Sequence, residues 1–191
     1  VYAHLDRDLS DFRKPFSFGR HPMPEAVDLV ALLARLGIGP GHQVVVYDAV
    51  DGAIAAGRFW WLLKLLGHQR VAVLDGGYAR WTKLGLPVTS DIAAVAPSTS
   101  QFAPRFDERM IGRDEDVASR LGEAPGWIID ARAAERFRGE VEPLDRVAGH
   151  IPGARNRPYA ANLRDGVYLS PEELRAAFAS DAEALNQVYN I

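Results

Sequence analysis

The strongest constraint on the fold is an internal repeat. Residues 24–25 begin a leucine-rich stretch that leads into 43–48, and residues 171–172 begin a second helical stretch that leads into 187–191. A pattern that recurs in this way indicates a duplicated structural unit. We therefore expect two domains with the same order of strands and helices, related by a pseudo-twofold axis.

Helical and strand patterns alternate along the first half of the chain. Residues 24–36 carry apolar side chains at helical spacing and end before Gly37, and 44–47 form a short apolar run typical of a strand buried on both faces. Residues 54–66 are again helical, and 71–74 form a second such run. This alternation predicts an α/β fold in which each domain has a mostly parallel sheet flanked by helices.

The pattern changes after Pro87. Residues 88–104 are rich in small residues and in Ser, Thr and Pro, with weak periodicity, which is typical of a linker. We therefore expect a first domain over 1–87, an interdomain linker over 88–109 and a second domain over 110–191. Within the second domain, residues 127–129 read as a strand running into Asp130, and residues 170–173 form a capping box that begins a helix.

Composition excludes several classes of function. A formal net charge of -3 with mixed signs gives no reason to expect nucleic acid or an anionic membrane as a partner. The longest apolar stretch, 59–66, is interrupted by Lys64 and is far shorter than the roughly 20 residues that span a bilayer. The chain has no cysteine and five scattered histidines, so we expect neither a disulfide framework nor a metal site.

Five groups of residues, spread over nearly the whole chain, occur in the order typical of one family. Glycine turns and strand-end aspartates are common singly, but the ordered set is specific. The set resembles the two-domain rhodaneses, the thiosulfate and 3-mercaptopyruvate sulfurtransferases. The groups are 44–48, Arg58-Phe59-Trp60-Trp61 with Gly67-His68, 73–77 with Trp81, Asp130-Ala131-Arg132 with Arg136-Phe137, and 149–154.

The resemblance implies a sulfurtransferase that needs no cofactor. In such proteins a cysteine thiolate takes sulfane sulfur from thiosulfate or 3-mercaptopyruvate and passes it, as a persulfide, to a thiol or cyanide. The cysteine stands first in a loop after a central strand of the second domain. The repeat places that position immediately after Ile191, so we expect both domains to be incomplete in this sequence. Asp48 holds the same position in the first domain, which implies an inactive site where Asp48 caps backbone amides.

The resemblance also implies the substrate-binding residues. Arg136 corresponds to the arginine that holds the anionic donor, and the alternative is a solvated helix arginine. Asp130 and Arg132 lie at the strand end that faces the site, and a purely structural ion pair is the alternative for them. Relatives that prefer 3-mercaptopyruvate carry a second arginine where this chain has Leu144, so we expect a preference for thiosulfate unless Arg146 replaces that arginine.

Other functions remain open at this point. A catalytically inactive rhodanese-like module for binding or regulation would account for the absence of cysteine, and phosphatases of related fold are a more distant alternative. We expect a cytoplasmic protein, and a periplasmic location stays open because residue 1 is Val rather than Met. A sulfurtransfer assay on the complete gene product would separate these alternatives.

Overall fold

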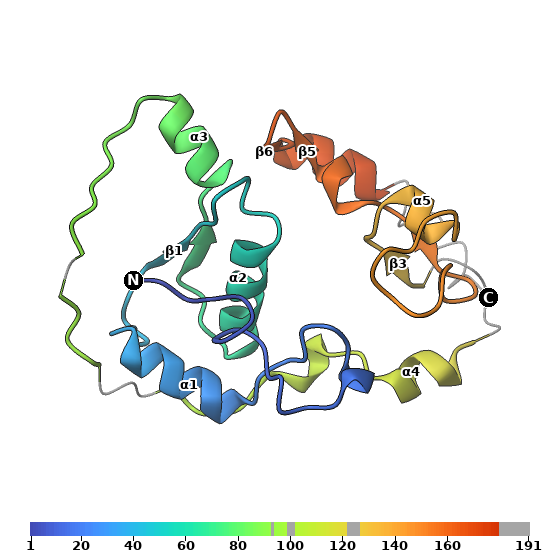
Figure 1. Ribbon diagram of the computed structural model, residues 1–191, viewed down its shortest axis with the longest axis horizontal. Helices are drawn as coiled ribbons and strands as arrows, with labels where there is room; N and C mark the ends of the chain where they lie inside the picture. The colour runs from blue at the N-terminus through green and yellow to red at the C-terminus, as the bar shows by residue number, and fades with distance from the viewer. Residues whose placement is uncertain (93, 99–101, 122–126, 180–191) are drawn as a thin grey trace. The chain divides into compact units, whose positions relative to one another are not determined.

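The computed structural model describes residues 1–92, 94–98, 102–121 and 127–179. The chain forms two compact units, Val1–Ile111 and Gly112–Ile191. Figure 1 shows α1, α2 and α3 in the first unit and α4 and α5 in the second. The strand expected over 187–191 lies outside the described residues.

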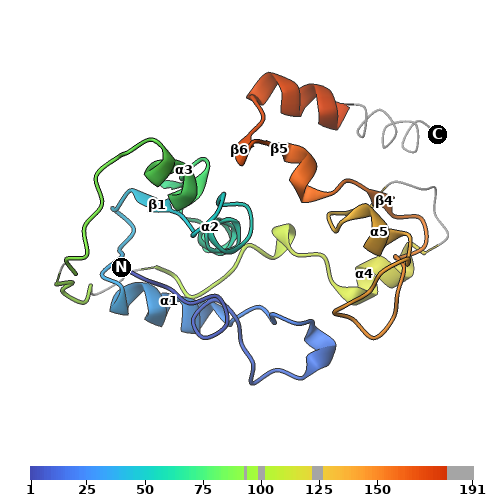
Figure 2. The ribbon, with the colours of Figure 1, turned by 45° about the horizontal axis from the view of Figure 1, so that its top comes forward.

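The first unit contains a parallel βαβ arrangement. Strands β1 (Val44–Val46) and β2 (Val71–Val73) pair with Val44 opposite Val71, and α2 (Ala55–Leu65) connects them. Figures 1 and 2 both show α2 beside the two strands. The prediction of alternating strands and helices with parallel pairing is confirmed for this unit.

Helices α1 and α2 bury leucine side chains in the core of the first unit. α1 (Ala26–Arg35) begins after Glu25, and α3 (Gly77–Lys83) begins at a left-handed Gly76; a short 3-10 helix, Phe16–Phe18, precedes α1. Burying apolar side chains is the main source of stability in such a core. The largest fully buried side chains are Leu29, Leu33, Leu62, Leu63 and Leu65.

The second part of the predicted linker belongs to the first unit. Phe106 is buried in its core, Phe102 packs edge-on against His68, and the backbone N–H of Asp107 donates to the carbonyl of Leu65 at 2.8 Å. A 3-10 helix, Glu108–Met110, follows. The compact unit therefore extends past residue 87, because the apolar Phe102 and Phe106 return the chain to its core. A domain boundary at residue 87 stays a prediction.

The second unit is built from short elements. α4 (Asp114–Ser119) precedes β3 (Ile129–Asp130) and α5 (Ala134–Phe137), and β4 (Arg155–Asn156) pairs in parallel with β3. The strand predicted to run into Asp130 is thus confirmed.

After β4 the chain forms a hairpin and a helix. The 3-10 helix Tyr159–Asn162 leads into β5 (Leu163–Arg164) and β6 (Val167–Tyr168), which pair antiparallel, and a helix over 171–179 follows. Ser170 and Glu173 form the predicted capping box, since each backbone N–H donates to the other's side chain at 2.9 and 3.2 Å.

Within the described residues, no helix is long and apolar enough to cross a membrane.

Candidate functional site

Asp130, the last residue of β3, holds Arg132 through several bonds. Its carboxylate accepts from the Arg132 backbone N–H at 2.9 Å and from Nη2 at 2.6 Å, and both oxygens lie 3.0 Å from Nε. Nη2 of Arg132 also donates to the carbonyl of Gly149 at 2.6 Å. The pair therefore ties the end of β3 to the glycine turn at 149, and the Arg132 guanidinium lowers the pKa of Asp130.

Glu142 joins the two arginines that the sequence singled out. Its carboxylate accepts from Nη2 of Arg136 at 2.8 and 3.0 Å and from Nη1 of Arg132 at 3.4 Å. Backbone N–H groups of Leu144 and Asp145 donate to the same carboxylate at 3.1 and 2.9 Å. The backbone N–H of Asp145, followed by Arg136, lowers the pKa of Glu142 to about 2.

Arg136 lies in the last turn of α5 and has a second acidic partner. Nη2 donates to Oδ2 of Asp145 at 2.7 Å, and the Arg136 side chain is 18% exposed. It is therefore not a solvated surface arginine. Among the residues that the structure describes, none accepts a hydrogen bond from its Nη1. A guanidinium with one unused N–H edge can bind an oxyanion.

The three predicted substrate-binding residues thus gather around one carboxylate that the sequence analysis did not assign. Asp130, Arg132 and Arg136 lie in one ion-pair network with Glu142. Arg132 donates hydrogen bonds to Asp130, to the Gly149 carbonyl and to Glu142. These bonds give Arg132 a structural role. The signal for Glu142 in the sequence is weak, because an acidic residue six positions after an arginine has no fixed spatial relation to it outside a helix.

The turn at 149–153 is held by packing. The ring of His150 stacks on Phe137 with centroids 3.7 Å apart, and its Nδ1 lies 2.7 Å from the Phe137 carbonyl oxygen. These contacts position the turn beside α5. They use one face of the His150 ring and its Nδ1 atom. Leu144 is half-exposed.

In the first unit, Asp48 caps the loop after β1. Its carboxylate accepts from the backbone N–H groups of Val50, Gly52 and Ala56 at 3.0, 2.9 and 3.3 Å. This is the capping that the sequence predicts for Asp48, and it links the end of β1 to the first turn of α2. The absence of catalysis at this loop stays a prediction.

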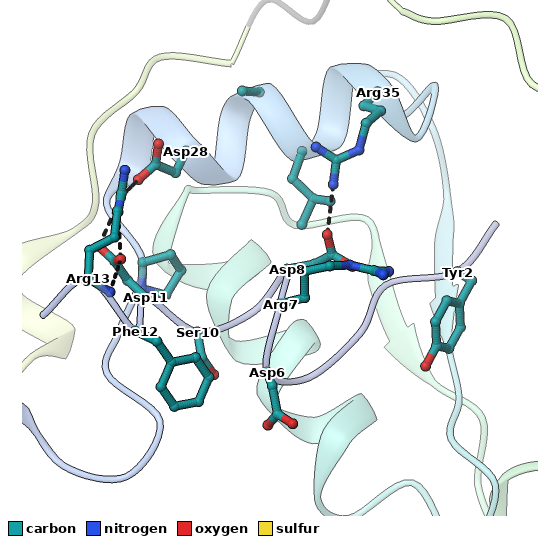
Figure 3. Close-up of a pocket in the computed structure, with 13 residues that line it drawn as sticks. Tyr2, Asp6, Arg7, Asp8, Ser10, Asp11, Phe12, Arg13, Asp28 and Arg35 are labelled. Atoms are coloured by element: carbon teal, nitrogen blue, oxygen red, sulfur yellow. Dashed lines mark hydrogen bonds and ion pairs between the residues drawn. The ribbon is translucent and has the colours of Figure 1, made fainter. Parts of the chain in front are cut away.

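A cavity of about 900 Å³ lies between the N-terminal segment and α1, and Figure 3 shows the residues that line it. Arg35 donates to Asp8 at 2.8 Å, and Arg13 bonds to Asp11 and Asp28 (Figure 3). The pKa values of Asp8 and Asp11 are lowered, although desolvation opposes the effect of the hydrogen bonds. None of the residues that the sequence analysis assigned to a functional site lines this cavity.

A histidine and an aspartate form one further pair in the first unit. Nε2 of His21 lies 3.0 Å from Oδ1 of Asp6, which also lines the cavity in Figure 3. An imidazole oriented by a carboxylate is an arrangement that can accept and return a proton. The sequence analysis did not single out this pair, because 15 residues separate its members.

A family model matches the part of the chain that contains the parallel βαβ unit and the loop after β1. Residues 4–84 match the family model described as the rhodanese-like domain. The match supports a rhodanese-like domain over these residues, in agreement with the resemblance that the motifs indicate.

Comparison with curated proteins extends the likeness over nearly the whole chain. A probable 3-mercaptopyruvate sulfurtransferase of Pseudomonas aeruginosa is 42% identical over 181 residues, which cover 94% of this chain and 63% of that protein. The thiosulfate sulfurtransferase of Cricetulus griseus is 35% identical over 187 residues, which cover 94% of this chain and 62% of that protein. The chain thus spans less than two thirds of the length of these relatives.

The chain is also similar to a solved structure of a protein with the same name as some of these relatives. The 3-mercaptopyruvate sulfurtransferase from Leishmania major superposes with a TM-score of 0.79 at 30% identity, over 96% of this chain and 51% of that chain. The α/β rhodanese fold predicted from the motifs is confirmed.

Proposed function

We propose that the complete protein is a sulfurtransferase that moves sulfane sulfur from thiosulfate or 3-mercaptopyruvate to a thiol or to cyanide. The observation that carries this proposal is the 42% identity, over 94% of the chain, to a relative named for this activity. The 191 residues contain no cysteine, and the relatives are longer. The proposal therefore places the nucleophile in a part of the complete protein outside this sequence.

The reaction divides into two displacements at sulfur. The cysteine thiolate attacks the outer sulfur of thiosulfate, the S–S bond breaks, and sulfite leaves with the electron pair. The acceptor then attacks the outer sulfur of the persulfide, and the cysteine thiolate leaves. Both steps balance without an oxidant, a metal or a cofactor.

Arg136 is the residue that we assign to the donor. Thiosulfate and the carboxylate of 3-mercaptopyruvate are anions, and a guanidinium binds such oxygens through paired N–H groups. The unused Nη1 edge among the described residues supports this role. Asp130 and Arg132 hold the end of β3 and the turn at Gly149 around it.

We further propose a preference for thiosulfate. Leu144 supplies no second cation for the larger keto acid, whereas thiosulfate is compact enough to be held by Arg136 and loop amides. Loss of one charge-assisted hydrogen bond of about 1.5–3 kcal/mol weakens 3-mercaptopyruvate binding by about one to two orders of magnitude.

The proposal places the reaction in the cytoplasm, where thiols are kept reduced and serve as acceptors. A net charge of -3 supports small molecules, rather than nucleic acid or a membrane surface, as partners.

A sulfurtransfer assay on the complete protein tests the proposal. We expect Arg136→Ala to lower kcat/KM for thiosulfate by about tenfold to a hundredfold, as loss of a charge-assisted bond predicts. Arg138→Ala is the matched control, because Arg138 is exposed and pairs with Glu140 at 2.7 Å. Absence of both turnover and persulfide in the wild-type protein would favour an inactive binding module, and higher kcat/KM for 3-mercaptopyruvate would refute the donor preference.

A further inference from the structure

We infer that Asp145 is an internal anion that competes with the donor for Arg136 and so sets the affinity for anionic donors. This inference rests on the proposed function, in which Arg136 binds the donor. The carboxylate of Asp145 accepts from Nη2 of Arg136 at 2.7 Å, which is the kind of contact that a sulfonate or carboxylate oxygen would make.

The two carboxylates on Arg136 are held very differently. Glu142 is 6% exposed and also accepts from Arg132 and from the backbone N–H groups of Leu144 and Asp145. The Asp145 side chain is 41% exposed. An exposed ion pair contributes little free energy because water competes for both partners. Asp145 can therefore leave Arg136 without disrupting the network around Glu142.

The charges of the network favour this exchange. Asp130, Glu142 and Asp145 surround the guanidinium groups of Arg132 and Arg136, so the cluster carries one more negative than positive charge. While Asp145 is bound to Arg136, the net negative charge of the cluster repels an incoming anion. When Asp145 turns into solvent, Arg136 gains a vacant N–H group on Nη2 in addition to Nη1.

The test is steady-state kinetics of Asp145→Asn in the complete protein, with thiosulfate as donor and dithiothreitol as an uncharged acceptor. In a two-step transfer, kcat/KM for each substrate reports its own half-reaction. We expect kcat/KM for thiosulfate to rise about two- to fivefold, the range of an exposed ion pair, and kcat/KM for dithiothreitol to stay unchanged. Competitive inhibition by sulfate is expected to strengthen by the same factor.

Glu140→Gln is the matched control. It also removes one negative charge, but Glu140 lies five residues before Asp145 and pairs with Arg138 instead of Arg136. We expect it to change neither constant. Asp145→Asn keeps the backbone N–H that Glu142 accepts, so the turn is retained. Asp145→Ser serves as a second variant, and it should show the same gain.

Three outcomes separate the inference from the function on which it rests. An unchanged or lowered kcat/KM for thiosulfate in both Asp145 variants, while Arg136→Ala still lowers it, overturns the inference alone. An equal gain in Glu140→Gln also overturns it, because bulk charge would then account for the effect. If Arg136→Ala leaves kcat/KM unchanged, the assignment of Arg136 to the donor fails as well.

Discussion

Glu142 is the residue on which the candidate site depends most directly. Its carboxylate bonds to Arg136, to Arg132 and to two backbone N–H groups, and only 6% of the side chain is exposed. Each of these donors stabilises the ionised form, so the pKa of Glu142 is lowered to about 2 from its ordinary value of 4.5. The charge of Glu142 thus contributes to the stability of the fold.

This shift predicts how stability depends on pH. Because the pKa is lower in the folded state, the contribution is fully present above pH 4.5 and is lost as the pH falls from 4.5 toward 2. We expect urea midpoints of the wild-type protein to fall more between pH 7 and pH 3 than those of Glu142→Gln, whose side chain does not titrate. Equal losses in both proteins would show that Glu142 is not responsible.

At the scale of elements, α3 and the loop after β1 are fitted closely together. The backbone N–H of Tyr78 donates to the carbonyl of Asp48 at 2.9 Å. Gly77 has φ +55, and a Cβ there would lie 2.6 Å from the carbonyl oxygen of Val50. The Gly76-Gly77 pair is therefore required by a close approach of two backbone segments as well as by a tight turn.

We expect Gly77→Ala to destabilise the first unit by about 2–6 kcal/mol, because the left-handed backbone and the clash each cost about 1–3 kcal/mol. Gly85→Ala isolates the first effect, since Gly85 has φ +66 and nothing within 4 Å of the added Cβ. Urea unfolding followed by circular dichroism measures both. A Gly77→Ala loss no greater than that of Gly85→Ala would refute the close approach.

At the scale of the whole molecule, the two units differ in how much they bury. Among the described residues, every buried apolar side chain of the core belongs to the first unit, from Leu9 to Phe106. The second unit is held to a greater extent by ion pairs and by backbone bonds between short strands. The first unit therefore carries its own core.

A pair of truncations tests where that core ends. We expect a fragment of residues 1–111 to unfold at higher urea concentration than a fragment of residues 1–87, because only the longer one contains Phe106, which is 7% exposed. Loss of a buried phenylalanine costs about 3–5 kcal/mol. Comparable midpoints would place the end of the domain at residue 87 after all.

Local patterns in the sequence determined most of the elements. The buried runs 44–47 and 71–74, the helix between them and the capping box at Ser170 follow from side-chain spacing and backbone geometry within a few residues. The capping role of Asp48 was implied by the resemblance to the two-domain rhodaneses. The Asp165-Gly166 dipeptide is a comparable local signal for the hairpin of β5 and β6, and both residues have the positive φ that its tight turn requires.

Tertiary structure alone decided the partners of the charged residues. Glu142 reaches Arg132 and Arg136 because the turn that follows α5 folds back on it, and β4 pairs with β3 across 26 residues of sequence. Phe106 returns to the core in the same way. Spacing along a chain specifies which face a side chain occupies, whereas the carboxylate that a guanidinium meets depends on distances between segments that only the folded chain brings together.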